Sequence, residues 1–163
     1  AISLSLAAML FYIWIRFEWQ FSLGAIVALF HDIIITLGIF SFLSLEINLS
    51  IVAAVLTIVG YSMNDTVVIF DRIRENLKKY SKIETKEIFD DSINETLSRT
   101  IITSVTTLLA LLSIYIFGGP ILMGFSFAMI VGVIVGTYSS IFVATPILNY
   151  TKVNQKTILK EDK

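Results

Sequence analysis

Apolar residues along this chain fall into long runs separated by shorter polar segments, a pattern that predicts membrane-spanning helices. Five runs stand out, with the bounds 2–15, 21–45, 49–70, 100–117 and 121–148. A helix of about 20 residues crosses a hydrocarbon core of about 30 Å, and the first run is barely long enough. Because lipid cannot satisfy free backbone groups, helices are the expected form. The pattern therefore predicts an all-α polytopic membrane helix bundle with five transmembrane helices within residues 1–150.

The connection 71–98 is the longest polar segment between two runs and has a helical pattern of its own. Ser81 and Glu84 have the spacing of a capping box, in which two side chains satisfy the free amides at a helix start. Apolar residues then recur at helical spacing among acidic ones, at Ile88, Phe89, Ile93 and Leu97. We expect a short amphipathic helix on the membrane surface here, and a solvated linker is the alternative.

Composition strengthens this interpretation and removes several others. Apolar residue types make up 56% of the 163 residues and charged ones 15%, against about 45–50% and about 25% in soluble domains. The chain contains no cysteine, which excludes disulfides, and a single histidine argues against a structural metal site. It begins inside an apolar run, without an initiator methionine or a basic segment. That start is not typical of a signal peptide, so we expect a domain of a longer protein.

Lysine and arginine are confined to one set of connections. Arg16 lies between the first two runs, and the segments 71–98 and 151–163 carry most of the others. The turns 44–48 and 118–120 carry none. The positive-inside rule therefore places the surface helix and the basic tail 151–163 in the cytoplasm, with both basic-free turns outside. The chain is expected to be a multi-pass membrane protein with a cytoplasmic C-terminus.

Small residues recur at every fourth position of the last run and, over a shorter stretch, of the second. The longer ladder consists of Gly124, Ala128, Gly132, Gly136, Ser140 and Ala144, and the shorter one of Gly24, Ala28, Asp32 and Thr36. Small residues let helix backbones approach closely in a membrane, where burial of apolar side chains gives little drive for association. The ladder is expected to pack on another helix, within the bundle or in a partner subunit.

Two acidic residues, Asp32 and Asp65, fall inside the runs. A carboxylate there costs about 2.5–3.5 kcal/mol on insertion scales, so a functional group that faces the bundle interior is the default interpretation. Arg99 begins the fourth run and shares a helix face with Thr103. We interpret Asp65 and Arg99 as a proton relay, because burial and a nearby cation move the pKa of a carboxyl in opposite directions. The alternative is a static pair that fixes helix packing.

Further polar residues beside these carboxylates are candidates for a supporting role. They are Asn64 and Thr66 next to Asp65, Thr103 next to Arg99, and His31 next to Asp32. A His–Asp pair could relay protons. Successive helical residues point in different directions, however, so a structural hydrogen bond to another helix stays an open alternative. The hydroxyl face of the fourth run could likewise form hydrogen bonds between helices or line a water-filled cavity.

The segment 60–76, Gly-Tyr-Ser-Met-Asn-Asp-Thr-Val-Val-Ile-Phe-Asp-Arg-Ile-Arg-Glu-Asn, resembles the signature of the SecF family of bacterial protein-export subunits. Further matches to that family follow in the same order at 16–19, 31–32, 95–100 and 132–140, so the resemblance covers about residues 1–148. The long motif also resembles, at a greater distance, the proton-site helix of resistance-nodulation-division (RND) exporters. Two adjacent carboxylates are usual there. Here the first is Asn64, which leaves Asp65 as the single candidate.

This resemblance implies the last five of six spans of an RND-type half-repeat, without the external domain that such proteins carry between the first two spans. It implies four kinds of partner: SecD, the SecYEG channel, exported polypeptides and membrane lipid, with no nucleic acid. The location would be the bacterial cytoplasmic (inner) membrane. The implied work is export assisted by the proton gradient, with protons as the coupling ion, no cofactor and no enzymatic activity.

Two other functions stay open. An RND-type exporter of small molecules or lipids would normally carry the paired carboxylate that Asn64 replaces. A passive membrane assembly scaffold would tolerate neutralisation of Asp65 without loss of function.

Overall fold

The computed structural model of this chain describes residues 18–80, 83–151 and 153, together with positions 7, 11, 12 and 15. In that part the protein is helical: α2 (Trp19–Phe42), α3 (Leu49–Lys79), α4 (Thr85–Phe117), α5 (Gly119–Ser139), the π-helical segment η1 (Ser140–Ala144) and α6 (Thr145–Tyr150). Four stretches are long and apolar enough to cross a membrane, with α5, η1 and α6 forming the last. Most of the run 2–15, Arg16 and most of the tail 151–163 lie outside the described residues, so the fifth span stays a prediction.

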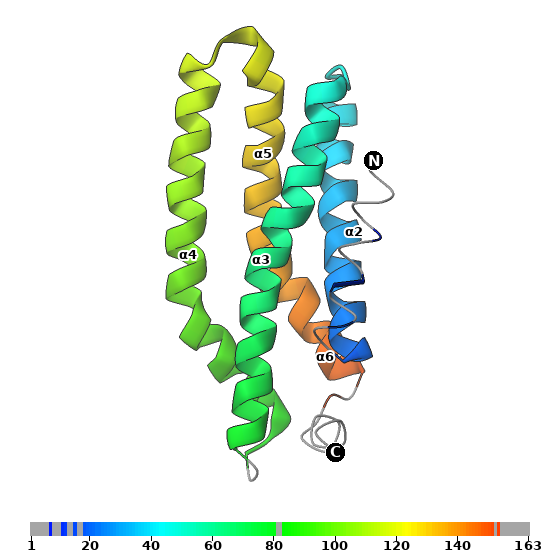
Figure 1. The fold of residues 1–163 in the computed structure, drawn as a ribbon, viewed down its shortest axis with the longest axis vertical. Coiled ribbons are helices and arrows are strands. Elements are labelled where there is room, and N and C mark those ends of the chain that lie inside the picture. Colours follow the sequence, from blue (N-terminus) through cyan, green and yellow to red (C-terminus); the bar gives the residue numbers. More distant parts are fainter. Residues whose placement is uncertain are drawn as a thin grey trace.

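The four long helices form one bundle in which α3 and α5 are central (Figure 1). Helices α2 and α4 pack on opposite sides of that pair (Figure 1). The turns after α2 and after α4 lie at one end of the bundle, and the connection between α3 and α4 lies at the other (Figure 1). The basic-free turns therefore share one end, which we call the turn end, and the basic connection marks the other, the basic end.

Turn chemistry fixes both connections at the turn end. Asn48 caps α3, because its side chain accepts a 3.2 Å hydrogen bond from the amide of Ile51. Gly119 has a φ of +76°, a conformation that suits glycine and lets the chain reverse directly after α4. Pro120 follows in the first turn of α5, where a missing N–H costs nothing.

The helices at the basic end are longer than the apolar runs that predicted them. Helix α3 continues to Lys79, past the expected end at residue 70, and α4 begins at Thr85 rather than at 100. The expected short surface helix is therefore not a separate element but the first part of α4. Its Ile88 and Phe89 are buried in an apolar cluster with residues of α3, which explains why this amphipathic stretch joins the bundle.

The start of α4 differs from the capping box expected there. The N-cap residue is Glu84, whose side chain makes no capping hydrogen bond. Ser81 lies outside the described residues.

The last span contains an irregularity that the apolar pattern did not indicate. Between α5 and α6, the segment Ser140–Ala144 is a π-helix. Pro146 explains the change, because proline has no N–H and its ring crowds the carbonyl four residues earlier in a regular helix. The proline instead sits in the first turn of α6, and the hydroxyl of Thr145 donates a 3.3 Å hydrogen bond to the carbonyl of Ser140.

Two apolar clusters fill the bundle, one toward each end. Phe40, Ile51, Ile58 and Val133 belong to the cluster toward the turn end. The cluster toward the basic end includes an edge-to-face pair of Phe21 and Phe70, whose ring centroids are 5.3 Å apart. Buried polar side chains gather between the two clusters, and these form the candidate site.

Candidate functional site

Asp32 is the centre of a buried hydrogen-bond network that joins three helices. The residue is 0% exposed. Its Oδ2 accepts a 2.5 Å hydrogen bond from the hydroxyl of Ser62 on α3 and a 2.8 Å bond from the hydroxyl of Ser139 at the end of α5. A buried carboxylate needs such donors because water does not reach it. The structural hydrogen bond left open for Asp32 is therefore present, and it reaches two helices.

His31 also contacts Asp32, although the two are neighbours in sequence. The Nδ1 atom of His31 lies 3.1 Å from Oδ1 of Asp32. Side chains of successive helical residues were expected to diverge, but Nδ1 adjoins the carbon that attaches the ring to its stem and so stays near the helix. The imidazole is partly exposed, whereas the carboxylate is not. His31 therefore links the buried carboxylate to the surface of α2.

Asp65 is the second buried carboxylate and has a different environment. It is 3% exposed and lies one helical turn from Ser62 on α3. Its Oδ2 is buried without a hydrogen-bond partner among the described residues. A charged carboxylate oxygen that is buried without a partner costs free energy, and a bound proton removes that charge. Asp65 is thus the less satisfied of the two acids that share the bundle interior.

Arg99 does not pair with Asp65 in the described part of the structure. Its side chain is exposed and lines an open hollow between α3 and α4, together with Asp71, Arg72, Glu75 and Glu95. Contacts between the two helices set the register, with Arg72 bonded to Glu95 and Tyr61 to Thr107. Asp65 lies between those two levels, opposite the part of α4 that contains Arg99. The two residues therefore belong to one region without being in contact.

The supporting residues expected around Asp65 divide into two groups. Thr66 is buried, and its hydroxyl bonds the carbonyl of Ser62 within α3. Thr103 is partly buried and bonds the carbonyls of Arg99 and Thr100 within α4. Asn64, by contrast, is exposed and points away from the buried layer. Polar links between helices come from other residues: Ser104 contacts Thr137 of α5 at 2.7 Å, and Tyr61 contacts Thr107 at 3.2 Å.

The small-residue ladder of the last span lies against α3 and then against α2. A β-carbon added to Gly132 would lie 2.3 Å from Ile58, and one added to Gly136 would lie 3.1 Å from Ser62. Further along, a β-carbon on Gly24 of α2 would meet the carbonyl of Ala144 at 3.0 Å. At about 100° per residue, each four-residue step turns about 40° past a full turn. The ladder therefore winds around the helix and serves two neighbours. Of the other ladder positions, Ala128, Ser140 and Ala144 are 0% exposed, whereas Gly124 is partly buried and a β-carbon there would lie at an ordinary 3.8 Å from Ile51.

The basic end of α3 is held to the start of α2 and to α4 by residues that were not predicted as site residues from the sequence. Arg74 forms an ion pair with Glu18, a buried residue at the start of α2 whose side chain is 2% exposed. Asn76 is buried and donates hydrogen bonds to Ser92 and Glu95 of α4. The available signal was the alternation of charged and apolar residues after residue 70, which places successive polar groups toward different helices.

Buried carboxylates and hydroxyl groups of this kind can bind protons and join helices by hydrogen bonds. The middle of the bundle holds two of the buried carboxylates, Asp32 with two hydroxyl donors and Asp65 with an unpartnered Oδ2 among the described residues, and hydroxyl groups lie between the helices. Within the described ranges, no group of three or more His, Asp or Glu residues lies close enough to hold a metal ion.

Comparison with protein families gives a match over nearly the whole chain. The family model described as protein export membrane protein SecD/SecF, C-terminal, matches residues 1–154. Among curated relatives, the protein translocase subunit SecF of Rhodothermus marinus is 63% identical over 143 residues, covering 84% of this chain and 46% of that protein. The same subunit of Rickettsia bellii is 59% identical over 148 residues, covering 91% of this chain and 49% of that protein. The chain thus spans about half the length of the curated relatives it matches.

Solved structures agree with this likeness. SecDF from Thermus thermophilus, described as a translocon-associated membrane protein, superposes with a TM-score of 0.87 at 46% identity, covering 90% of this chain and 20% of that one. A structure of SecDF in a super-membrane-facing form gives a TM-score of 0.86 at 44% identity, covering 97% of this chain and 22% of that one.

Proposed function

Because the chain belongs to the SecD/SecF family of protein export membrane proteins, we propose that it is the membrane domain of a SecF-like subunit that couples the proton gradient to protein export. The single observation that carries the proposal beyond family membership is the pair of buried carboxylates in the middle of the bundle. Acidic groups are expensive inside a membrane and mark proton or ion pathways. A domain that only had to hold its helices together could do so with the hydroxyl groups and small residues already present.

Asp65 is the proposed proton-binding group. Among the described residues, its buried Oδ2 has no hydrogen-bond partner, so binding a proton would remove the cost of an unpaired buried charge. Arg99 lines the hollow at the basic end and lies opposite the part of α3 that carries Asp65. Loss of the proton from Asp65 would draw Arg99 inward to form an ion pair, and rebinding would release it. These two states give the helices α3 and α4 a reason to repack with each proton.

His31 and Asp32 form a proposed second group on the other side of α3. Ser62 connects them to the helix that carries Asp65, one turn away. Ser139 of α5 donates to the same oxygen of Asp32 as Ser62 does. A movement of α3 caused by the proton at Asp65 would therefore reach α2 and α5 through these two hydroxyl groups.

Partners and placement extend the proposal. The SecDF structures support a SecD partner for this half-repeat, and export would proceed with the SecYEG channel and a polypeptide substrate. The long exposed apolar face of α4, with Ile101, Ile102, Val105 and Leu109, suits such a partner or lipid. We propose further that the run 2–15 would be the fifth span, and that the basic end and the C-terminus face the cytoplasm at a bacterial inner membrane.

The test compares Asp65→Asn with Asp65→Glu in the full-length protein and its natural partners. Inverted membrane vesicles would complete the ATP-driven stage of export of a secreted reporter, and the remaining translocation would be measured with and without a protonophore. Asp65→Asn should assemble normally and lose the protonophore-sensitive part, while Asp65→Glu keeps some of it. Wild-type, protonophore-sensitive export by Asp65→Asn would instead favour a passive scaffold.

The same vesicles distinguish protein export from transport of another class of substrate. An RND-type exporter of small molecules or lipids would move those compounds in an Asp65-dependent manner, without any effect on the secreted reporter.

A further inference from the structure

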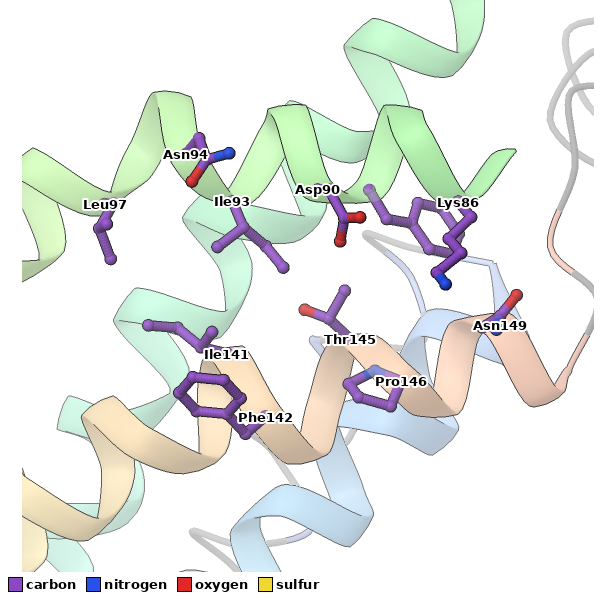
Figure 2. Close-up of a pocket in the computed structure, with 11 residues that line it drawn as sticks. Lys86, Asp90, Ile93, Asn94, Leu97, Ile141, Phe142, Thr145, Pro146 and Asn149 are labelled. Carbon is purple, nitrogen blue, oxygen red and sulfur yellow. The ribbon is translucent and has the colours of Figure 1, made fainter. Parts of the chain in front are cut away.

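A groove near the basic end of the bundle lies between the first part of α4 and the segment formed by η1 and α6. Its volume is about 650 Å³, which is in the range of ligand pockets. Figure 2 shows its lining residues approaching one another from the two elements. It lies apart from the buried carboxylates, and none of its lining residues has a role in the proposed function.

The two ends of the groove differ in chemistry. Lys86 and Asp90 point from α4 toward α6 at the end near the basic connection, and Asn149 faces them (Figure 2). The opposite end is lined mainly by the apolar side chains of Ile93, Leu97, Ile141 and Phe142, together with one polar residue, Asn94 (Figure 2). Polarity therefore changes along the groove from charged near the basic connection to mostly apolar toward the bundle middle.

The charged end carries one positive and one negative side chain side by side. Lys86 and Asp90 are four residues apart, so they occupy the same face of α4. Both are exposed, and no ion pair joins them among the described residues. A ligand with an anion next to an ammonium group would meet Lys86 with the first and Asp90 with the second. A purely anionic ligand would be repelled by Asp90.

We propose that this groove binds a phospholipid of the cytoplasmic leaflet with an amine-bearing, zwitterionic headgroup. Its phosphate contacts Lys86 and the amide of Asn149, its ammonium contacts Asp90, and one acyl chain lies along Ile93, Ile141 and Phe142. The assignment to that leaflet rests on the orientation proposed above. The partly buried walls and the highly exposed Phe142, at 62%, leave the apolar end open to the surrounding lipid.

The test uses the full-length protein purified with its partner subunit and an equimolar mixture of phosphatidylethanolamine, phosphatidylcholine and phosphatidylglycerol with identical acyl chains. Native mass spectrometry would count each lipid that stays bound. Phosphatidylethanolamine should be retained about two- to fivefold over each of the others, because all three lipids share the phosphate and a single surface contact at Asp90 strengthens binding only a few-fold. Its primary ammonium donates hydrogen bonds to Asp90, which the methylated amine of phosphatidylcholine cannot do.

Variants locate the preference. Lys86→Gln combined with Asp90→Asn should remove it, and both residues are exposed, so the fold should persist. Leu97→Trp fills the apolar end and should reduce retention of all three lipids. Lys79→Gln removes an exposed lysine at the same end of the bundle outside the groove, and it should change nothing.

Three results would overturn the proposal. Equal retention of the three lipids would mean contact with bulk lipid only. An unchanged preference in the Lys86 and Asp90 double variant would place the headgroup elsewhere. A disulfide between Phe142→Cys and Ile158→Cys, formed efficiently in membranes, would make the C-terminal tail the occupant.

Discussion

Asp32 and Ser139 are 107 positions apart in sequence, and the serine hydroxyl donates a 2.8 Å hydrogen bond to the buried carboxylate. Ser62 donates to the same oxygen from a third helix. One carboxylate oxygen thus fixes the relative positions of α2, α3 and α5. Its two donors are hydroxyl groups rather than cations, so this link is set by hydrogen bonding and not by charge neutralisation.

We predict that Ser62→Ala and Ser139→Ala each lower the stability of the purified protein by about 0.6 kcal/mol, with about 1.7 kcal/mol as the upper range. Because both hydroxyls donate to Oδ2, the effects should not add, and a double-mutant cycle should give a coupling energy of similar size. The measurement is reversible unfolding in mixed micelles. Ser113→Ala is the control, since that exposed hydroxyl bonds only its own helix. Equal losses in all three variants would argue against a special role for Asp32.

Gly132→Ala should destabilise the contact between α3 and α5 by about 1–3 kcal/mol, the usual cost of overpacking. The added β-carbon would fall 2.3 Å from Ile58, a branched side chain that is 1% exposed, so the two helices or the Ile58 side chain would have to shift. Gly124→Ala is the matched control, because its β-carbon would meet Ile51 at an ordinary 3.8 Å.

Ile58→Ala in the Gly132→Ala background tests the cause. Removal of the γ carbons makes room for the new methyl group, so the double variant should lose less stability than the sum of the two single variants. Strictly additive losses would show that Gly132 matters for another reason, such as helix flexibility.

Glu18→Ala should weaken the basic end of the bundle more than Glu75→Ala does. Both acids pair with an arginine of α3, but the Glu18 side chain is 2% exposed and that of Glu75 is 63% exposed. Loss of a buried partner leaves Arg74 unpaired and partly desolvated, whereas an exposed pair contributes about 0–1 kcal/mol. Protease cleavage near residue 80, compared in the two variants, reports the difference. Equal cleavage would mean that the Glu18 pair is also solvated.

Single cysteines test the orientation, and the absence of native cysteine in this chain makes the experiment clean. An impermeant thiol reagent added to intact cells should label Glu46→Cys and Gly119→Cys at the turn end. Lys79→Cys and Lys156→Cys should react only after the membrane is opened. Labelling at 79 and 156 in intact cells, without labelling at 46 and 119, would reverse the assignment of sides.

The helical class and the apolar cores of four spans were predictable, because length and hydropathy alone decide them. The ends of α3 and α4 were not, since their polar residues belong to the bundle through partners such as Asn76 and Ser92. Hydropathy records only that these residues are polar. It does not indicate that the polar faces of two helices will form hydrogen bonds with each other.

The candidate site shows a similar division. That Asp32 and Asp65 face the interior followed from the cost of a charge in lipid. Which groups meet them depends on the rotation and register of neighbouring helices, and these are set by packing over the whole length of the bundle. The contact of Asp65 with Arg99 stays a prediction for the ionised state.

The ladder of small residues also limits how α5 can move. Ile58 sits where Gly132 has no side chain, and Gly136 offers a second such notch about 6 Å further along the same helix. A slide of α5 by a fraction of that distance would press Ile58 against the β-carbons between the notches. We therefore expect α5 to move along α3 in whole steps of about this length. One step is long enough to carry Ser139 out of hydrogen-bonding range of Asp32. The hydrogen bond between these two residues would therefore break in the same movement.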